Sequence, residues 1–227
     1  MERPATEVHG ILPNLDQFLL LVANTVLVGA AIGMERTVVP LLGHNVYHLG
    51  TLATLSFIVT FGISKAVLNL VAGGWSDRIG RRPVLITGWL LGIPMIALLL
   101  GVQAWWAVLA ANVLLGANQA LAWTMTVTSQ MDLAGPSQRG ISMGINEATG
   151  YIGVALATGA TGYIASHFGL RTAPFLLGLV VVVAGLVLSA GFIRDTRRFA
   201  RLESRSAERE PEPIWETFEL SPVRRTV

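Results

Sequence analysis

The composition of this 227-residue chain is typical of a membrane protein, because 52% of the residues are hydrophobic and only 13% are charged. Soluble domains carry about 25% charged residues, and several apolar runs approach the roughly 20 residues of a membrane-spanning helix. These runs, for example residues 174–190, do not alternate as the strands of a membrane barrel do. The net charge of +2 comes without a continuous basic groove, which argues against nucleic-acid binding. The absence of cysteine excludes disulfides, thiol catalysis and Cys-ligated metal.

Six apolar segments predict an all-α membrane protein with six transmembrane helices. Residues 1–14 precede the first span, and residues 194–227 form a mixed-charge tail that we expect to be mostly disordered and outside the membrane. We therefore expect the membrane-embedded domain to cover residues 15–193. The predicted spans are residues 15–33, 49–71, 84–101, 107–130, 141–166 and 172–193.

The arginines of the connections predict the orientation of the chain. Positively charged residues collect in cytoplasmic loops, and one side of the predicted bundle holds far more of them than the other. This asymmetry places both termini in the cytoplasm of a multi-pass protein of the cell membrane. The richer side holds Arg3, Arg78, Arg81, Arg82, Arg139 and the start of the tail, whereas the other side holds Arg36 and Arg171.

A short polar segment, residues 73–83, separates the second and third spans. Its charges would be costly in hydrocarbon, so it must lie at a water boundary. Asp77 and Arg81 are four residues apart and can pair if the segment is partly helical. Glycines at its start and middle allow close backbone approach and a sharp turn. The pattern consists of Gly73, Asp77, Arg78, Gly80, Arg81 and Arg82.

This pattern resembles the signature loop between helices 2 and 3 of major facilitator superfamily transporters. The resemblance implies the N-terminal half of that fold, a nested repeat of three plus three helices. It also implies that Asp77 latches against a helix end of the other half. Arg81 would pair with an acidic group near the end of helix 4, where Asp132 lies, and this cluster would gate the alternation between outward and inward states. The alternative is a basic loop that only orients the protein.

The fourth predicted span carries a polar face, because Asn112, Gly116, Gln119 and Trp123 recur at helical spacing. These side chains either line a cavity or hydrogen-bond between helices. The resemblance implies an arginine at the position of Asn112, and that arginine is associated with proton coupling in many members. Its absence argues against that form of proton-driven transport.

The fifth predicted span carries Asn146 and Glu147. An ionisable group at this depth is costly unless it is paired or hydrated, so Glu147 is a candidate proton or cation site. The alternative is a structural ion pair with Arg139, two helical turns away. The span lacks the Gly-Pro pair that the resemblance associates with many drug exporters.

Further polar candidates lie in the first two spans. Lys65 and Asn69 share a helical face, and Lys65 either extends toward the cytoplasm, pairs with Glu147 or meets an anionic substrate. Glu35 and Arg36 close the predicted first span and either line the outer vestibule or lie on the surface. The histidines have no metal-ligand spacing, so we predict neither a metal nor a cofactor.

The resemblance implies transmembrane transport of a small solute by alternating access. Because it covers one six-helix half, we expect a second half as partner, supplied by a separate chain or by a homodimer. The expected surroundings are the lipid bilayer and a small-molecule solute, without nucleic acid. The alternative is a truncated, non-transporting membrane fragment or assembly partner. A six-helix intramembrane serine protease is rejected, because Ser129 and Ser142 lack a Gly-x-Ser-Gly context and a membrane-embedded histidine.

Overall fold

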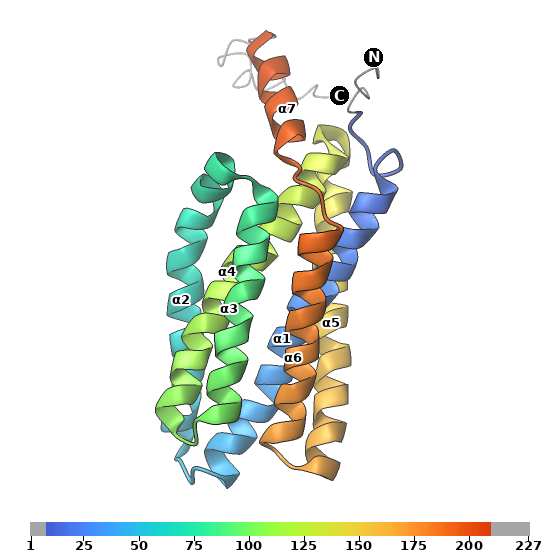
Figure 1. Cartoon of the computed structure of the whole chain (residues 1–227). Coiled ribbons are helices and arrows are strands. Elements are labelled where there is room, and N and C mark those ends of the chain that lie inside the picture. Colours follow the sequence, from blue (N-terminus) through green and yellow to red (C-terminus); the bar gives the residue numbers. More distant parts are fainter. Residues whose placement is uncertain (1–7, 210–227) are drawn as a thin grey trace, which may run out of the picture.

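The computed structural model of the chain describes residues 8–209, and that part is helical, without strands. Its long helices run side by side along one axis, and a shorter helix projects from one end (Figure 1). The helices are α1 (Leu15–Asn45), α2 (Thr51–Ile79), α3 (Arg81–Gly101), α4 (Trp105–Ala134), α5 (Arg139–Phe168), α6 (Thr172–Gly191) and α7 (Arg197–Arg209), with a 3₁₀ turn at Pro136–Gln138. We call the end that carries the α2–α3 turn, the α4–α5 junction and α7 the charged end.

Five of the long helices, α1, α2, α3, α4 and α6, are long and apolar enough to cross a membrane. The chain is therefore a multi-pass membrane protein. Helix α5 has 30 residues but is not among the five, because its glycines and polar residues such as Asn146 and Glu147 lower its hydropathy. The count of six transmembrane helices stays a prediction.

Helix α1 is the central element of the bundle. It packs along α5 and also contacts α4 and α6, while α2 packs against α4, and α3 packs against α4 and α6. The α1–α5 contact depends on glycine: a Cβ at Gly29 would lie 2.0 Å from the Gly150 carbonyl oxygen, and one at Gly153 would lie 2.1 Å from that of Val26. Small residues allow backbones to approach this closely in membrane helices.

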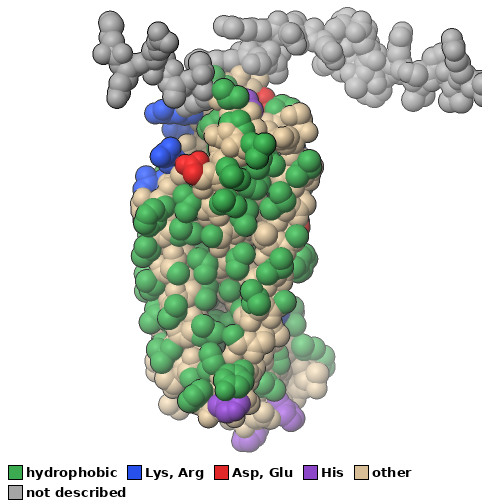
Figure 2. Space-filling view, turned by 90° about the vertical axis from the view of Figure 1, so that its right-hand side faces the viewer, with side chains coloured by type: hydrophobic (Ala, Val, Ile, Leu, Met, Phe, Trp, Pro, Cys, Tyr) green, Lys and Arg blue, Asp and Glu red, His purple; other side chains and the backbone are tan. Residues whose placement is uncertain are grey.

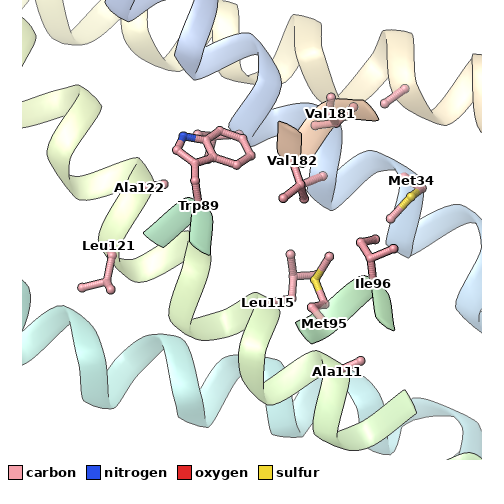
Figure 3. Close-up of a cluster of buried hydrophobic side chains, with 14 of the residues drawn as sticks. Met34, Trp89, Met95, Ile96, Ala111, Leu115, Leu121, Ala122, Val181 and Val182 are labelled. Carbon is pink, nitrogen blue, oxygen red and sulfur yellow. The ribbon is translucent and has the colours of Figure 1, made fainter. Parts of the chain in front are cut away.

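The apolar core lies where α1, α3, α4 and α6 meet. Figure 3 shows Trp89 and Ile96 of α3, Met34 of α1, Leu115 of α4 and Val182 of α6 around a common interior. All of these side chains are buried. This core fixes the relative positions of α1 and α4, which carry Glu35, Arg36 and Asp132 among the candidate residues.

The surface of the bundle is divided along its axis. Figure 2 shows hydrophobic side chains over the length of one face, with Lys, Arg and acidic side chains near the charged end and His mainly at the opposite end. Helix α2 is the least covered: 17% of its most apolar window is buried, against 67% for α4. Its exposed leucines and valines face lipid or another protein.

The helices continue beyond the predicted spans. Helix α1 runs through Glu35, Arg36 and Pro40 to Asn45, so the expectation that Glu35 and Arg36 close the helix is wrong. Helix α4 likewise includes Asp132. Apolarity marks the part of a helix that lies in the membrane, whereas backbone hydrogen bonding continues into water, and Glu and Arg are good helix formers.

The predicted polar loop at residues 73–83 is also mostly helical. Helix α2 ends at Ile79 and α3 begins at Arg81, so Gly80 alone makes the turn, with φ of 109°. This backbone conformation favours glycine because it has no Cβ.

The tail differs in part from the expected disorder, because Arg197–Arg209 forms α7. Its Arg and Glu residues favour a helix, and Glu203 binds Arg139 at 2.5 Å, which anchors α7 to the start of α5. The expectations for residues 210–227, and for residues 1–7 of the N-terminal segment, lie outside the described residues.

Candidate functional site

The charged end contains a buried ionic cluster around Arg81. Arg81 donates through Nη1 to Asp77 Oδ1 at 2.5 Å and to Ser76 Oγ at 2.7 Å, and through Nε to Asp132 Oδ2 at 3.2 Å. The Thr196 hydroxyl donates to the same Asp132 oxygen at 2.8 Å. We call Asp77, Arg81, Asp132 and Thr196 the Arg81 cluster. It joins α2, α3, α4 and the segment after α6.

Burial is unequal within the Arg81 cluster. The side chains of Arg81 and Asp132 are 8% and 9% exposed, whereas that of Asp77 is 67% exposed. Charge-assisted hydrogen bonds are about twice as strong as neutral ones, so the buried Arg81–Asp132 pair is the firm part of the cluster. Asp77 retains room for a further partner at the bundle surface.

A second set of contacts holds the α2–α3 turn against the α6–α7 junction. Asp195 Oδ2 accepts a hydrogen bond from the Arg82 backbone N–H at 3.2 Å. A Cβ added at Gly80 would lie only 2.2 Å from the same oxygen, so the carboxylate packs against the glycine. The Arg82 guanidinium donates to the Ser189 carbonyl at 3.3 Å and also to that of Ala190, near the end of α6. A cation at a helix C-terminus favours the helix dipole.

Asp195 and Thr196 were missed by the sequence reasoning, which assigned them to a disordered tail. The available signal was an acidic residue and a hydroxyl directly after the last apolar run. Arg78 donates no side-chain hydrogen bond that joins it to the Arg81 cluster among the described contacts; its carbonyl accepts from Arg197 Nη1 at 2.6 Å. Around Gly73 and Gly74 the space is open, since a Cβ at either would meet nothing within 4 Å.

Several of the predicted polar residues hydrogen-bond between helices in the bundle interior. Gln119 is buried and donates to the Val28 carbonyl of α1 at 3.0 Å. Asn146 is buried too, and its Oδ1 accepts from Thr25 at 3.0 Å and from Gln130 at 3.1 Å. For these residues the structure favours interhelical hydrogen bonding over cavity lining.

Lys65, Trp123 and Glu147 come together from α2, α4 and α5. The Trp123 indole N–H donates to Glu147 Oε1 at 3.2 Å, and the Lys65 ammonium lies 5.4 Å from the centroid of a Trp123 ring. Glu147 is exposed on the bundle surface. The alternative pairing of Glu147 with Arg139 does not form, because Arg139 binds Glu203 instead. Nearby, Asn69 accepts a hydrogen bond from the Thr124 hydroxyl at 3.2 Å.

Glu35 lies in the interior of the bundle. It is 2% exposed, and neither carboxyl oxygen has a hydrogen-bond partner; the nearest cation, Arg36 Nε, lies 3.7 Å away. Asn112 of α4 is buried close to this carboxyl group, and its side-chain oxygen also lacks a partner. The Arg36 guanidinium lies over the Phe61 ring, 4.8 Å from its centroid. The buried position of Glu35 therefore differs from both positions expected from the sequence, the outer vestibule and the surface.

Two charged regions thus stand apart on the bundle. The Arg81 cluster lies at the charged end, and the second region is formed by Glu35, Arg36, Lys65, Trp123 and Glu147, which we call the mid-bundle group. Within residues 8–209, no group of three or more His, Asp or Glu residues is placed to hold a metal ion.

Comparisons with known proteins identify the family of this chain. A model of the Major Facilitator Superfamily matches residues 21–225. The chain is 28% identical over 181 residues to Multidrug resistance protein 2 of Bacillus subtilis (strain 168), which covers 79% of this chain and 44% of the relative. It is 30% identical over 178 residues to Multidrug resistance protein MdtG of Salmonella choleraesuis (strain SC-B67), covering 74% of this chain and 42% of the relative. The chain spans less than half the length of these curated relatives.

Proposed function

Because this chain belongs to the major facilitator superfamily, we propose that it is the N-terminal half of a secondary transporter that moves a small solute across the cell membrane by alternating access. The observation that carries this proposal is the Arg81 cluster, which ties three spans and the start of the tail together at one end of the bundle. Proteins of this family are generally not enzymes, so the proposed activity is transport without chemical change of the solute. The excess of arginine at the charged end supports a cytoplasmic location for that end.

The Arg81 cluster is proposed to act as a latch. Its buried Arg81–Asp132 pair keeps the ends of α3 and α4 together, and the exposed Asp77 carboxylate is free to contact a helix of a second half. Alternating access requires that packed helices and their ion pairs have two distinct arrangements. In one state the latch is closed, and in the other Asp77 releases the second half.

A second six-helix half is proposed as the partner. Helix α2 leaves most of its length uncovered, and the exposed Glu147 and half-buried Lys65 of the mid-bundle group would face lipid if the chain stood alone. Charged groups facing lipid are costly, so we expect a polar surface to cover them. The partner is a separate polypeptide, a second copy of this chain or a continuation of the same polypeptide.

The mid-bundle group is the proposed cargo site. It combines charges of both signs with aromatic rings from α2 and α4, which suits a small amphipathic solute. Both relatives are named as multidrug resistance proteins. Their names support export of organic molecules, although the Gly-Pro pair of many drug exporters is absent from α5.

The test is the variant Asp77→Asn in proteoliposomes. Uptake of radiolabelled 2-naphthoate, tetraphenylphosphonium and glucose is measured, so that the panel contains an anion, a cation and a neutral solute. We expect uptake of at least one solute, reduced at least about tenfold by Asp77→Asn at an unchanged amount of protein per liposome. If Asp77→Asn lowered uptake and the amount of protein per liposome equally, the role of Asp77 would be purely structural. Absence of uptake of every solute by a chain assembled with its second half would contradict the proposal.

A further inference from the structure

Two cations of the mid-bundle group lie on the same aromatic ring. The Arg36 guanidinium of α1 is 4.8 Å from the centroid of Phe61, and the Lys65 ammonium of α2 is 5.8 Å from it. The Phe61 side chain is almost fully buried. Like charges brought this close repel each other unless anions compensate them, so the arrangement raises the question of what neutralises the pair.

The acids near this pair compensate it poorly. Arg36 Nη1 is buried without an acceptor, and the closest carboxylate oxygen, on Glu35, is 3.7 Å from Nε, which is too far for a hydrogen bond. Within residues 8–209, no Asp or Glu oxygen lies within 4.0 Å of Lys65 Nζ. Contacts with aromatic rings stabilise a cation less than a charge-assisted hydrogen bond does. Arg36 Nη1 and the Lys65 ammonium therefore keep donors that an acceptor from outside the chain can use.

The position of Glu147 disfavours a cationic occupant. One of its carboxylate oxygens already accepts the Trp123 indole N–H, and the Lys65 ammonium occupies the region over a Trp123 ring. A cation that stacked on Trp123 would have to displace Lys65, and one that paired with Glu147 would meet the Lys65 charge. A neutral solute would leave the donors of Arg36 and Lys65 without acceptors.

We infer that the cargo carries an anionic group, a carboxylate or a sulfonate, which Arg36 and Lys65 bind together while an apolar body packs beside Trp123. This inference rests on the proposed transport function. The Arg36 side chain is 30% exposed and those of Lys65 and Trp123 are half-buried, so all three are reachable. Glu35 is then the internal counter-ion that competes with the cargo for Arg36.

The test is isothermal titration calorimetry of the purified chain in lipid nanodiscs, with 2-naphthoate as the probe and tetraphenylphosphonium as the cationic comparison. We expect saturable binding of 2-naphthoate, weakened at least about tenfold by Arg36→Gln and by Lys65→Gln. Glu35→Gln removes the competing carboxylate, so it tightens binding severalfold. The matched control is Arg171→Gln: Arg171 also lies over an aromatic ring, that of Tyr47, 6.0 Å from its centroid, but outside the mid-bundle group. This control leaves the affinity unchanged.

Conservative variants separate lost binding from lost folding. Arg36→Lys and Lys65→Arg keep the charge and should retain binding within about threefold, and size-exclusion profiles check the fold of every variant. The inference is overturned by absence of saturable 2-naphthoate binding, by binding that Arg36→Gln and Lys65→Gln leave intact, or by weaker binding in Glu35→Gln. Binding of tetraphenylphosphonium that Glu35→Gln or Glu147→Gln abolishes would instead assign a cationic cargo.

The outcomes also distinguish this inference from the proposed function. Uptake of tetraphenylphosphonium, sensitive to Asp77→Asn, without binding of 2-naphthoate would retain the transporter and reject the anionic cargo. Binding of 2-naphthoate at Arg36 and Lys65 without any uptake by the assembled protein would retain the anion site and reject transport.

Discussion

The Arg81 cluster and the mid-bundle group contain similar residue types but differ in how well they are satisfied. In the Arg81 cluster, the buried guanidinium has acceptors on three side chains, and the buried Asp132 carboxylate has two donors on one oxygen. In the mid-bundle group, both Glu35 oxygens and one Arg36 nitrogen are buried without partners. A satisfied network holds one arrangement of its helices. An unsatisfied one leaves donors and acceptors for a ligand.

This comparison predicts opposite consequences of substitution. Changes in the Arg81 cluster should lower stability, whereas changes at exposed positions of the mid-bundle group should alter transport with little effect on stability.

Asp132→Ala should destabilise the protein by about 3 kcal/mol, because it leaves the buried Arg81 guanidinium with only the exposed Asp77 carboxylate as counter-ion. Unfolding by denaturing detergent in mixed micelles measures the change. The matched control is Glu203→Gln, which removes the exposed ion pair with Arg139 and should cost about 0–1 kcal/mol. Similar losses in the two variants would show that burial of the Arg81 cluster contributes nothing.

Gly80→Ala should destabilise by about 2 kcal/mol. A Cβ would be forced into a positive-φ conformation and would collide with the Asp195 carboxylate. Gly73→Ala is the control, because its Cβ would meet nothing within 4 Å and its helical position favours alanine. Thermal unfolding of both variants in micelles gives the comparison, and equal midpoints would refute a tight turn at Gly80.

Thr196→Val should cost about 1 kcal/mol, the typical contribution of one hydrogen bond. It removes the donor to Asp132 Oδ2 and keeps the shape of the side chain. The double variant with Asp132→Ala should show strong non-additivity, since the two groups share that bond. Additive losses in the same micelle assay would mean that the bond does not form in solution.

Glu147→Gln should change stability by less than about 0.5 kcal/mol, because Glu147 is exposed. Its effect should appear in transport, because the variant removes a negative charge beside Trp123 and Lys65. Uptake of an anion should therefore rise, and uptake of 2-naphthoate into proteoliposomes checks this. Unchanged or lower uptake in the variant would show that the Glu147 charge does not oppose an anionic cargo.

The all-helical class and the helix order could be read from the sequence, because apolar runs of membrane length dictate them. The spacing of Asp77 and Arg81 predicted their pairing, since residues four apart meet on a helix whatever surrounds them. Helix ends were less predictable. The positions where the apolar runs end, near Glu35 and Gly73, lie within continuous helices, because hydropathy follows membrane depth and backbone hydrogen bonding does not.

Only the tertiary structure decided the use of each polar residue. Asn146 and Glu147 are neighbours in the chain, yet one is buried against α1 and α4 while the other reaches the surface beside Trp123. A helix turns by 100° per residue, so the side chain that meets a partner depends on which helices surround it. The same reason explains why Asp195 reaches the α2–α3 turn from more than a hundred residues away, and why Thr196 binds Asp132 of α4. The sequence determined the type and order of the helices, and their packing determined which charges are satisfied and which are left for a ligand.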